Sequence, residues 1–362
     1  MIAWLGRAGA CLAAIVAVLV TGASPARADT VRDQEWHLAA LRIAEAHEVS
    51  QGEGVVVALP DTGVDTKHAE LAGALLPGKG FGEGNEQSDG TGDFIGHGTA
   101  MAGLIAGRGL PGGGGILGIA PKAMILPLQT LRNEDGNGNP AFLAAGIDWA
   151  VGHGAKVVCV AGGAGASAQL REAVERALRA DVVVVAAVGN APAAKAVAFP
   201  ANLPGVLAVA GTDRDGNHAA ISVSGPEVVI AAPAVDIAST RLGGKYMTAT
   251  GTSDATAIVA GVVALVRAKY PALSGPEVVR RITATAIDKG KPGRDDEFGF
   301  GIVDPVGALT MEIAPESPSV SVGSGGAAAP RKTGGVWWIV AGGVVLGGVV
   351  VGVALRRRAS RF

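Results

Sequence analysis

The chain has 362 residues and a formal net charge of -2, with 30 Lys and Arg residues against 32 Asp and Glu residues. Because nucleic-acid-binding domains carry a clear excess of basic charge, this balance gives no electrostatic support for binding to nucleic acid. The 56 glycines follow no three-residue period, which excludes collagen and indicates many tight loops.

The first 28 residues have the pattern of a secretory signal peptide. Arg7 supplies a positive charge, an apolar run follows at residues 11–20, and Ala26-Arg27-Ala28 forms an A-x-A cleavage site. The alternative is an uncleaved anchor, but the apolar run is short for a membrane span. We therefore expect cleavage after Ala28, which leaves residues 29–51 as an N-terminal extension.

Between residues 52 and 314, short apolar runs alternate with longer amphipathic or apolar stretches. The predicted strands, apolar almost throughout as in buried parallel strands, are residues 54–59, 123–128, 156–161 and 181–187. The predicted helices are residues 98–106, 140–151, 168–179 and 252–269, and a last one from Ser274, which has capping-box spacing with Glu277. This alternation predicts an α/β sandwich with a mainly parallel sheet, whose functional groups gather at the carboxyl ends of the strands.

The first predicted strand leads into a carboxylate, Asp61, which is followed by Thr62 and Gly63. At the carboxyl end of a sheet, this side chain could accept a hydrogen bond from an imidazole. The alternative interpretation is a polar residue that only turns the chain after a strand.

His97 lies in the sequence Gly-His-Gly-Thr-Ala, after a glycine-rich loop and at the start of a predicted helix. It is the only one of the six histidines with this setting, and its imidazole could face a cleft. The others are interpreted as surface or structural residues: His37, His47, His68, His153 and His218.

Cys159 is the only cysteine that remains after removal of the signal peptide, so the mature chain cannot form an internal disulfide. It lies in the apolar run Val-Val-Cys-Val at residues 157–160, which favours a buried, unreactive thiol. The sequence has no H-E-x-x-H motif and no Cys/His cluster, so we expect no catalytic metal ion and no cofactor.

Ser253 lies at the start of the predicted helix 252–269, in the sequence Gly-Thr-Ser-Asp-Ala-Thr-Ala. A serine in this position is usually a helix cap. The same position would direct the partial positive charge of the helix at Ser253, whose backbone N–H could then bind a developing oxyanion.

The C-terminal end predicts a membrane anchor. Residues 315–335 are rich in Pro, Ser, Gly and Ala, as in a flexible tether. Residues 336–355 are apolar over about the 20 residues that a helix needs to cross the hydrocarbon core. Trp337 and Trp338 begin this span, and the arginines of residues 356–362 predict a cytoplasmic tail with the rest of the chain outside.

Three motifs resemble those of the subtilisin family of serine proteases, and they occur in the order of that family. They are Asp-Thr-Gly at residues 61–63, Gly-His-Gly-Thr at residues 96–99 and Gly-Thr-Ser at residues 251–253. The resemblance covers about residues 52–309 and implies a subtilisin-like three-layer sandwich with the predicted transmembrane helix after it.

The resemblance also implies the roles of particular residues. Asp61, His97 and Ser253 correspond to the catalytic triad of the family, and Asn190 corresponds to its oxyanion asparagine. For Asn190, the alternative is a residue that turns the chain after a strand. Residues 158–163 match the strand that pairs with extended substrate, which implies substrate binding by Ala161, Gly162 and Gly163.

Within that family, the layout is most similar to the mycosins, the membrane-anchored subtilases of type VII secretion. The similarity rests on Arg-Asp-Gln-Glu-Trp-His-Leu at residues 32–38 and on the C-terminal span with its arginine tail. It implies protein or peptide substrates, a single-pass location at the cell membrane and partners in the secretion complex. The alternative function is a structural subunit that stabilises a secretion complex with little or restricted proteolysis.

The chain departs from the family pattern at three points. Residues 159–163 read Cys-Val-Ala-Gly-Gly where most subtilases have an Asn-x-Ser-Leu-Gly-like run, which leaves the substrate preference open. Ala257 stands where most subtilases have a proline four residues after the nucleophile. The cysteine pairs that mycosins often have in extra loops are absent from the mature sequence.

Overall fold

The computed structural model describes residues 31–82, 88–131 and 137–313. The predicted signal peptide, tether, membrane span and arginine tail all lie outside the described residues. Within the described ranges, no helix is both long enough and apolar enough to cross a membrane.

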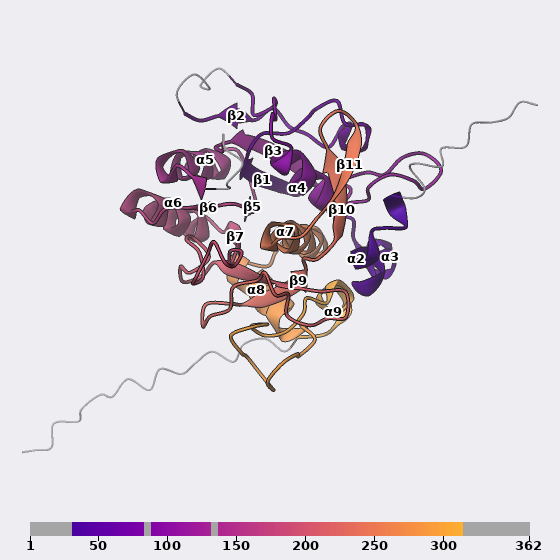
Figure 1. Cartoon of the computed structure of the whole chain (residues 1–362), viewed down its shortest axis with the longest axis vertical. Coiled ribbons are helices and arrows are strands. Elements are labelled where there is room, and N and C mark those ends of the chain that lie inside the picture. Colours follow the sequence, from indigo (N-terminus) through magenta and orange to yellow (C-terminus); the bar gives the residue numbers. More distant parts are fainter. Residues whose placement is uncertain (1–30, 83–87, 132–136, 314–362) are drawn as a thin grey trace, which may run out of the picture. The chain divides into compact units, whose positions relative to one another are not determined.

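The centre of the described fold is a seven-stranded sheet in which every neighbouring pair of strands is parallel (Figure 1). In spatial order the strands are β2 (Lys79–Gly80), β3 (Met124–Gln129), β1 (Val56–Asp61), β5 (Val157–Val160), β7 (Val183–Ala187), β8 (Leu207–Thr212) and β9 (Ile230–Pro233). Their continuous apolar runs follow from burial on both faces. The predicted α/β fold with a mainly parallel sheet is confirmed.

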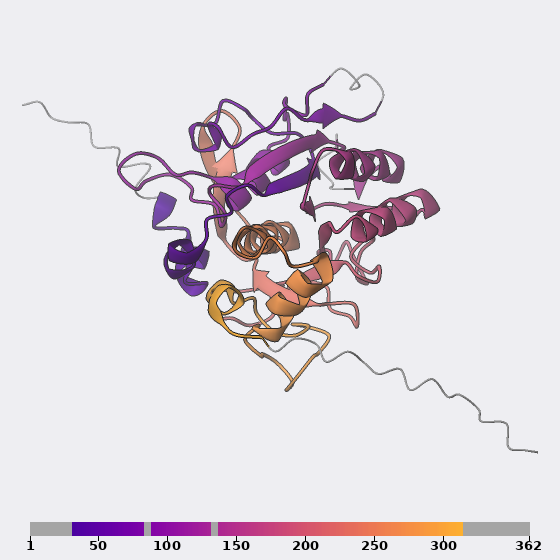
Figure 2. The ribbon, with the colours of Figure 1, turned by 180° about the vertical axis from the view of Figure 1, so that it is seen from behind.

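Helices cover both faces of this sheet (Figures 1 and 2). On one face lie α5 (Pro140–Gly152) and α6 (Ala168–Arg179), which pack on each other and on β1 and β7. The other face is covered by α2 (Trp36–Ala40), α3 (Ile43–Val49), α4 (His97–Ala106), α7 (Thr252–Lys269), α8 (Gly275–Ala284) and α9 (Pro305–Thr310). Successive residues of a strand point to opposite faces of the sheet, and each face has its own hydrophobic core. Val158 therefore packs with α5 and α6, whereas Cys159 packs with α7.

The helix α7 runs through the middle of the second core and has the predicted bounds. It packs on α4 and on strands β5, β7, β8 and β9, and almost all of its side chains are buried. Small residues allow this close packing, because a Cβ on Gly261 would lie 2.6 Å from Cβ of Ile119. The N-terminal end of this rigid, buried helix carries Ser253.

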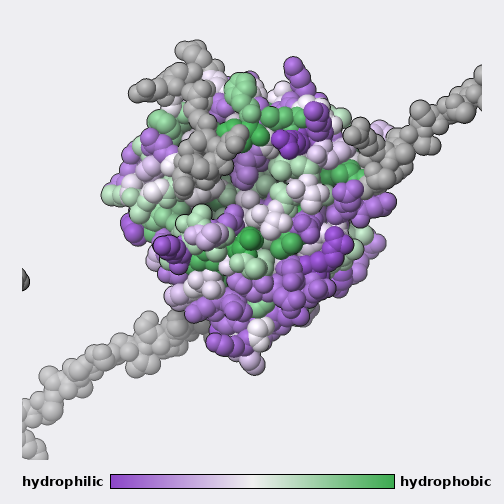
Figure 3. Space-filling model, viewed as in Figure 1, coloured by the Kyte–Doolittle hydropathy of each residue, from purple (hydrophilic) through white to green (hydrophobic). Residues whose placement is uncertain are grey.

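The surface helix α8 shows the opposite pattern. Val278 and Ile282, one turn apart, are buried and Val279 packs partly buried against the same core, whereas Pro276, Glu277 and Ala284 are exposed. Ser274 and Glu277 form the predicted capping box, in which the Ser274 N–H donates to Glu277 Oε2 at 2.7 Å. Polar residues dominate the lower part of the surface in Figure 3, where α8 and α9 lie in Figure 1.

The predicted strand at residues 156–161 and the predicted substrate strand at residues 158–163 differ from the structure. Strand β5 ends at Val160, and Gly163–Ala164 forms a separate strand, β6, which pairs with β4 (Asn137–Gly138). Ala161 and the two glycines lack the β-branched side chains that favour a continued strand, and the chain leaves the sheet there. The sequence analysis also missed β8, β9 and the antiparallel hairpin of β10 (Ile237–Arg241) and β11 (Lys245–Ala249).

The described part of the N-terminal extension, residues 31–51, forms hydrogen bonds and an ion pair with the peptidase domain at several points. Trp36 Nε1 donates to the carbonyl oxygen of Val235 at 3.1 Å, and Arg42 pairs with Asp304 at 2.7 Å. Ser50 Oγ donates to the carbonyl oxygen of Leu265 on α7 at 2.9 Å. These contacts join the extension to the outer side of the α7 layer, and none of its described residues lines the cleft that contains Ser253.

Candidate active site

Asp61, which is buried, and His97, which is partly exposed, form a hydrogen-bonded pair. Asp61 is the last residue of β1 and His97 is the first residue of α4. His97 Nδ1 lies 2.8 Å from Asp61 Oδ1 and 2.9 Å from Asp61 Oδ2, and the Thr62 N–H donates to Oδ1 at 2.7 Å. Because the carboxylate accepts the Nδ1 proton, it fixes the ring orientation and leaves Nε2 for chemistry in the cleft.

Asp93 holds the loop that delivers His97. Its Oδ1 accepts the N–H groups of Ile95 at 3.0 Å and Gly96 at 2.8 Å, and its Oδ2 accepts the Thr99 N–H at 3.0 Å. Gly96 has a φ of 99°, a conformation that favours glycine. A Cβ on Gly98 would lie 2.1 Å from the carbonyl oxygen of Gly63, so the Gly-His-Gly sequence is required for α4 to approach the end of β1.

Ser253 is the second residue of α7, after Gly251 as the N-cap and Thr252 as the first helical residue. The N-cap residue is Gly251, which has no side chain to cap the helix, so Ser253 is not the cap that such a serine usually is. The first N–H groups of a helix have no partner inside it, and the helix dipole places partial positive charge there. The local structure therefore favours negative charge beside Ser253.

Asn190 follows β7 and borders the same space as Ser253. Its Oδ1 accepts both the N–H and the hydroxyl of Thr252 at 2.9 Å, which leaves the Nδ2 donor for other partners. A Cβ on Gly251 would lie 2.9 Å from Ser253 Oγ and 3.6 Å from Asn190 Nδ2. The glycine thus keeps open a small space with a hydroxyl on one side and an amide donor on the other.

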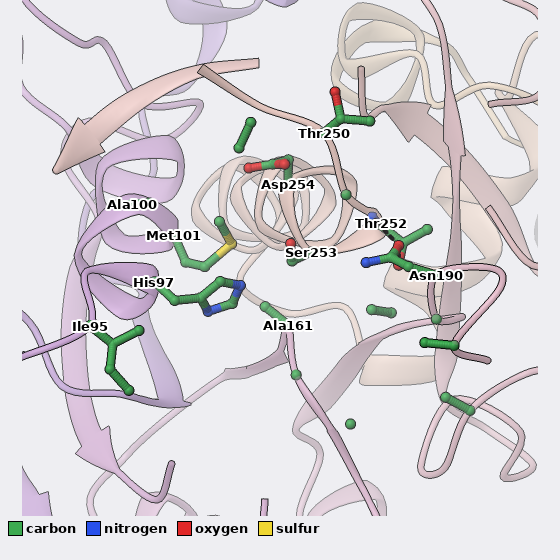
Figure 4. A pocket seen from close by; sticks show the side chains of 18 of the residues that line it. Ile95, His97, Ala100, Met101, Ala161, Asn190, Thr250, Thr252, Ser253 and Asp254 are labelled. Atoms are coloured by element: carbon green, nitrogen blue, oxygen red, sulfur yellow. Dashed lines mark hydrogen bonds between the residues drawn. The ribbon is translucent and has the colours of Figure 1, made fainter. Parts of the chain in front are cut away.

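These groups meet in one cleft of about 590 Å³. In Figure 4 the imidazole of His97 points toward Ser253, and Asn190 lies on the other side of Ser253. The other predicted site residues that line the cleft are Ala161, Gly162 and Gly163. Asp61 is buried behind His97 and does not line the cleft, and neither do the other five histidines.

Asp254, the residue after Ser253, also lines the cleft and was missed by the sequence analysis. Only 1% of it is exposed, and its Oδ1 has no hydrogen-bond partner in the described part of the chain. Burial raises the pKa of Asp254 to about 7, although nearby His97 acts to lower it. An acidic residue near the start of a helix that is mostly apolar farther along is the signal that would have found it.

His97 is surrounded by carboxylates. Burial acts to lower the pKa of its imidazole, but Asp61, Asp254 and Asp93 together raise that pKa to about 9. The site therefore stabilises a protonated ring, which is the form that a general base takes up in a transition state.

The comparison with protein families matches residues 52–301 to the subtilase family. This chain belongs to that family. It is 36% identical over 270 residues to the thermostable alkaline protease of Halalkalibacterium halodurans, across 74% of this chain and 71% of the relative. This subtilase is therefore a serine endopeptidase by family.

Solved structures of mycosins are also similar to this subtilase. MycP1 from Mycobacterium smegmatis matches with a TM-score of 0.67 and 30% identity, over 78% of this chain and 86% of MycP1. The MycP3 protease from the type VII (ESX-3) secretion system matches with a TM-score of 0.64 and 31% identity, over 76% of this chain and 88% of MycP3. The chain is thus a subtilisin-like serine protease related to the mycosins.

Proposed function

We propose that this subtilase is a membrane-anchored extracytoplasmic endopeptidase whose triad is Asp61, His97 and Ser253, and that it acts in type VII secretion. The observation that carries the catalytic part is the position of His97. Its Nδ1 lies 2.8 Å from a buried carboxylate, and its ring points toward a serine at a helix start (Figure 4).

The reaction is acyl transfer to the hydroxyl of Ser253. His97 Nε2 takes the proton from Oγ as this oxygen attacks the peptide carbonyl, and it later gives a proton to the leaving amine. Asp61 stays ionised, orients the ring and stabilises the imidazolium. Water then attacks the acyl-enzyme with His97 again as the base, which releases the acid product and restores Ser253.

The oxyanion is stabilised by two donors, Asn190 Nδ2 and the backbone N–H of Ser253. Support for Asn190 comes from its Oδ1, which is held by Thr252 at 2.9 Å, so that the amide group is fixed before substrate arrives. Donors that are oriented in advance need no rearrangement as charge develops, and this is the usual source of a large rate effect.

The acyl half of the substrate lies along Ala161, Gly162 and Gly163. Support comes from the absence of side chains beyond Cβ at these three positions, which leaves the backbone open to an extended peptide at the cleft wall. The short strand β6 gives only a small edge for pairing, so substrate selection must come largely from other parts of the cleft.

The proposed location rests on the sequence and on the relatives. The apolar segment at residues 336–355 with its arginine tail supports a single span and an extracytoplasmic domain. The similarity to MycP1 and MycP3 supports a role beside a type VII secretion complex.

The alternative is a scaffold that stabilises the secretion complex with little proteolysis. The interruption of the expected substrate strand after Val160 favours this alternative, because it limits backbone pairing with a substrate. The two functions differ in what they require of Ser253, and both can be tested in the same cells.

The test compares deletion of the whole chain with Ser253→Ala at normal protein level. We expect Ser253→Ala to abolish cleavage of a partner protein near the membrane, and deletion to damage secretion more strongly. Ser167→Ala, which removes the N-cap serine of α6, is the matched control and should retain cleavage. Undiminished partner cleavage in Ser253→Ala cells would contradict the proposed catalytic function.

A further inference from the structure

We propose that Arg241 and Lys245 form a subsite for an acidic side chain in the leaving half of the substrate, shortly after the scissile bond. This inference rests on the proposed function, since it assumes that a peptide is cleaved at Ser253. It assigns a substrate class, namely peptides with Asp or Glu on the carboxyl-terminal side of the cut.

The charge distribution in the cleft singles out Arg241. Among the described residues that line the cleft, the ionisable ones are His97, Asp254 and Arg241. His97 is the proposed base and Asp254 is buried, whereas Arg241 is exposed and permanently charged. In the described part of the chain, no hydrogen bond or ion pair engages its guanidinium.

Lys245 stands beside Arg241 on the same hairpin. The two residues are directly opposite each other in the antiparallel pair of β10 and β11, so their side chains project from the same face. Met247 and Ala249, at alternate positions along β11, line the cleft, which places Lys245 on the cleft-facing side as well.

Like charges directly opposite each other destabilise a hairpin unless an anion compensates them. In the described ranges, two carboxylates reach this hairpin and both have partners: Glu70 accepts the Tyr246 hydroxyl and pairs with His68, and Asp65 accepts backbone groups. Asp65 Oδ2 accepts the Gly243 N–H at 2.9 Å and its Oδ1 accepts the Lys67 N–H at 2.9 Å. The two cations are therefore available to an anion from outside the chain.

The position of Arg241 along the cleft identifies the half of the substrate that it meets. Its Cγ lies 3.9 Å from where a Cβ on Gly96 would be, next to His97. His97 must deliver its proton to the leaving amine, so the leaving half of the substrate lies on this side. In Figure 4 Asn190 lies on the side of Ser253 away from His97, where the oxyanion would be, and Ala161, along which the acyl half would lie, is below Ser253 between the two.

The hairpin is held in place, so the cations need little ordering when a ligand binds. His68 Nε2 lies 3.0 Å from the carbonyl oxygen of Lys245, and the Tyr246 hydroxyl donates to Glu70 Oε1 at 2.6 Å. A carboxylate side chain is the ligand that fits best, because the guanidinium fork binds it through two parallel hydrogen bonds.

The experiment uses the full-length, detergent-solubilised protein and a defined library of synthetic peptides whose cut sites are read by mass spectrometry. We expect Asp and Glu to be enriched within the first three positions after the cut. The kcat/KM for a Glu peptide should then be roughly fivefold higher than that for the matched Gln peptide, the factor that corresponds to an exposed ion pair. This preference should shrink in high salt, because exposed charges are screened.

Charge variants give the decisive comparison. Arg241→Gln combined with Lys245→Gln should remove the Glu preference, so that the Glu and Gln peptides are cleaved with equal kcat/KM, and Arg241→Glu should favour a Lys peptide. Arg179→Gln, on α6 at the opposite face of the sheet, is the control that should keep the Glu preference. A Glu preference that survives in the double variant, or that is absent from the wild type, would overturn the subsite.

Binding separates this inference from the proposed function. The same Glu and Gln peptides, labelled with a fluorophore, are titrated against the Ser253→Ala variant, in which no cleavage is needed. Tighter binding of the Glu peptide supports the subsite even if the wild type cleaves nothing, a result that would contradict only the proposed function. Equal binding of the two peptides would overturn the subsite itself.

Discussion

Two histidine–carboxylate pairs in this molecule have nearly the same nitrogen–oxygen distance and opposite settings. His97 Nδ1 lies 2.8 Å from Asp61 Oδ1, and His68 Nδ1 lies 2.7 Å from Glu70 Oε2. The side chain of His97 is 34% exposed, with Nε2 left for the cleft, whereas His68 is fully buried with Nε2 against the Lys245 carbonyl. A paired carboxylate alone therefore does not mark a histidine as catalytic; the proposed mechanism also requires a free second ring nitrogen beside the proposed nucleophile.

The largest expected effect comes from changing each histidine in the same way. His97→Gln should lower kcat on a peptide substrate by about 10⁶, the loss known for removal of the equivalent group in a subtilisin. His68→Gln should change kcat by less than about tenfold, since the ring only holds the hairpin. Steady-state kinetics on folded variants would check this, and comparable losses of kcat would refute the distinction.

The next largest effect is expected at Asn190, the proposed oxyanion donor in the cleft with His97. Asn190→Ala should lower kcat by roughly 10²–10³ with little change in KM, a magnitude established for a subtilisin. Asn202→Ala, whose Nδ2 donates to the Val197 carbonyl at 3.3 Å, is the control and should retain kcat. A normal kcat in Asn190→Ala would mean that Asn190 only turns the chain.

For the other pair, His68 and Glu70, the expected effect is on the free energy of unfolding rather than on kcat. Removal of the imidazole in His68→Gln leaves Glu70 buried without its cation, which should cost about 3 kcal/mol of unfolding free energy. Burial lowers the pKa of His68, but Glu70 and the Lys245 carbonyl raise it above its ordinary 6.5. Burial likewise raises the pKa of Glu70, but His68 and Tyr246 hold it below its ordinary 4.5.

The sign of the pH dependence follows from these two shifts. The contribution of His68 is complete below pH 6.5 and is lost as pH rises through its raised pKa. The contribution of Glu70 is complete above pH 4.5 and is lost as pH falls through its lowered pKa. Denaturant unfolding should thus show the largest difference between wild type and His68→Gln from pH 4.5 to 6.5, and a difference independent of pH would contradict this.

The smallest effect is expected at Asp254, a further carboxylate near His97 and outside the His97–Asp61 pair. Asp254 is one of the groups that raise the pKa of His97 to about 9, and its ionised form keeps the ring protonated. Asp254→Asn should lower the pKa of His97 and move the acid limb of the kcat/KM profile to lower pH, because the free base then forms earlier. Asp213→Asn, on an exposed turn, is the control, and an acid limb that stays in place would exclude this role for Asp254.

The sequence predicted those parts of the site that depend on local signals. Asp61, His97 and Ser253 each lie at an element end marked by glycine. The structure brings His97 and Ser253 to one cleft, with Asp61 buried against His97. The bounds of α6 and α7 were predicted correctly because capping residues and continuous apolar runs are local features.

What the sequence could not supply are contacts between distant segments. His68 meets Lys245 across 177 positions, and no local pattern indicates that pairing. Strand β8, Leu207–Thr212, is rich in Ala and Gly and forms because its neighbours in the sheet stabilise it, against its weak strand propensity. Strand β1 ends at Asp61, two residues later than predicted, because pairing with β3 continues to that residue.

The most direct test of the central claim is to locate the nucleophile by chemistry. A fluorophosphonate probe is added to native membranes that contain the full-length protein, and the modified peptide is identified by mass spectrometry, with His97→Gln and His68→Gln membranes alongside. We expect one adduct, on Ser253, in the wild type and in His68→Gln, and none in His97→Gln. An adduct on another serine, or equal labelling of Ser253 without His97, would contradict the assignment of His97 and Ser253 as base and nucleophile.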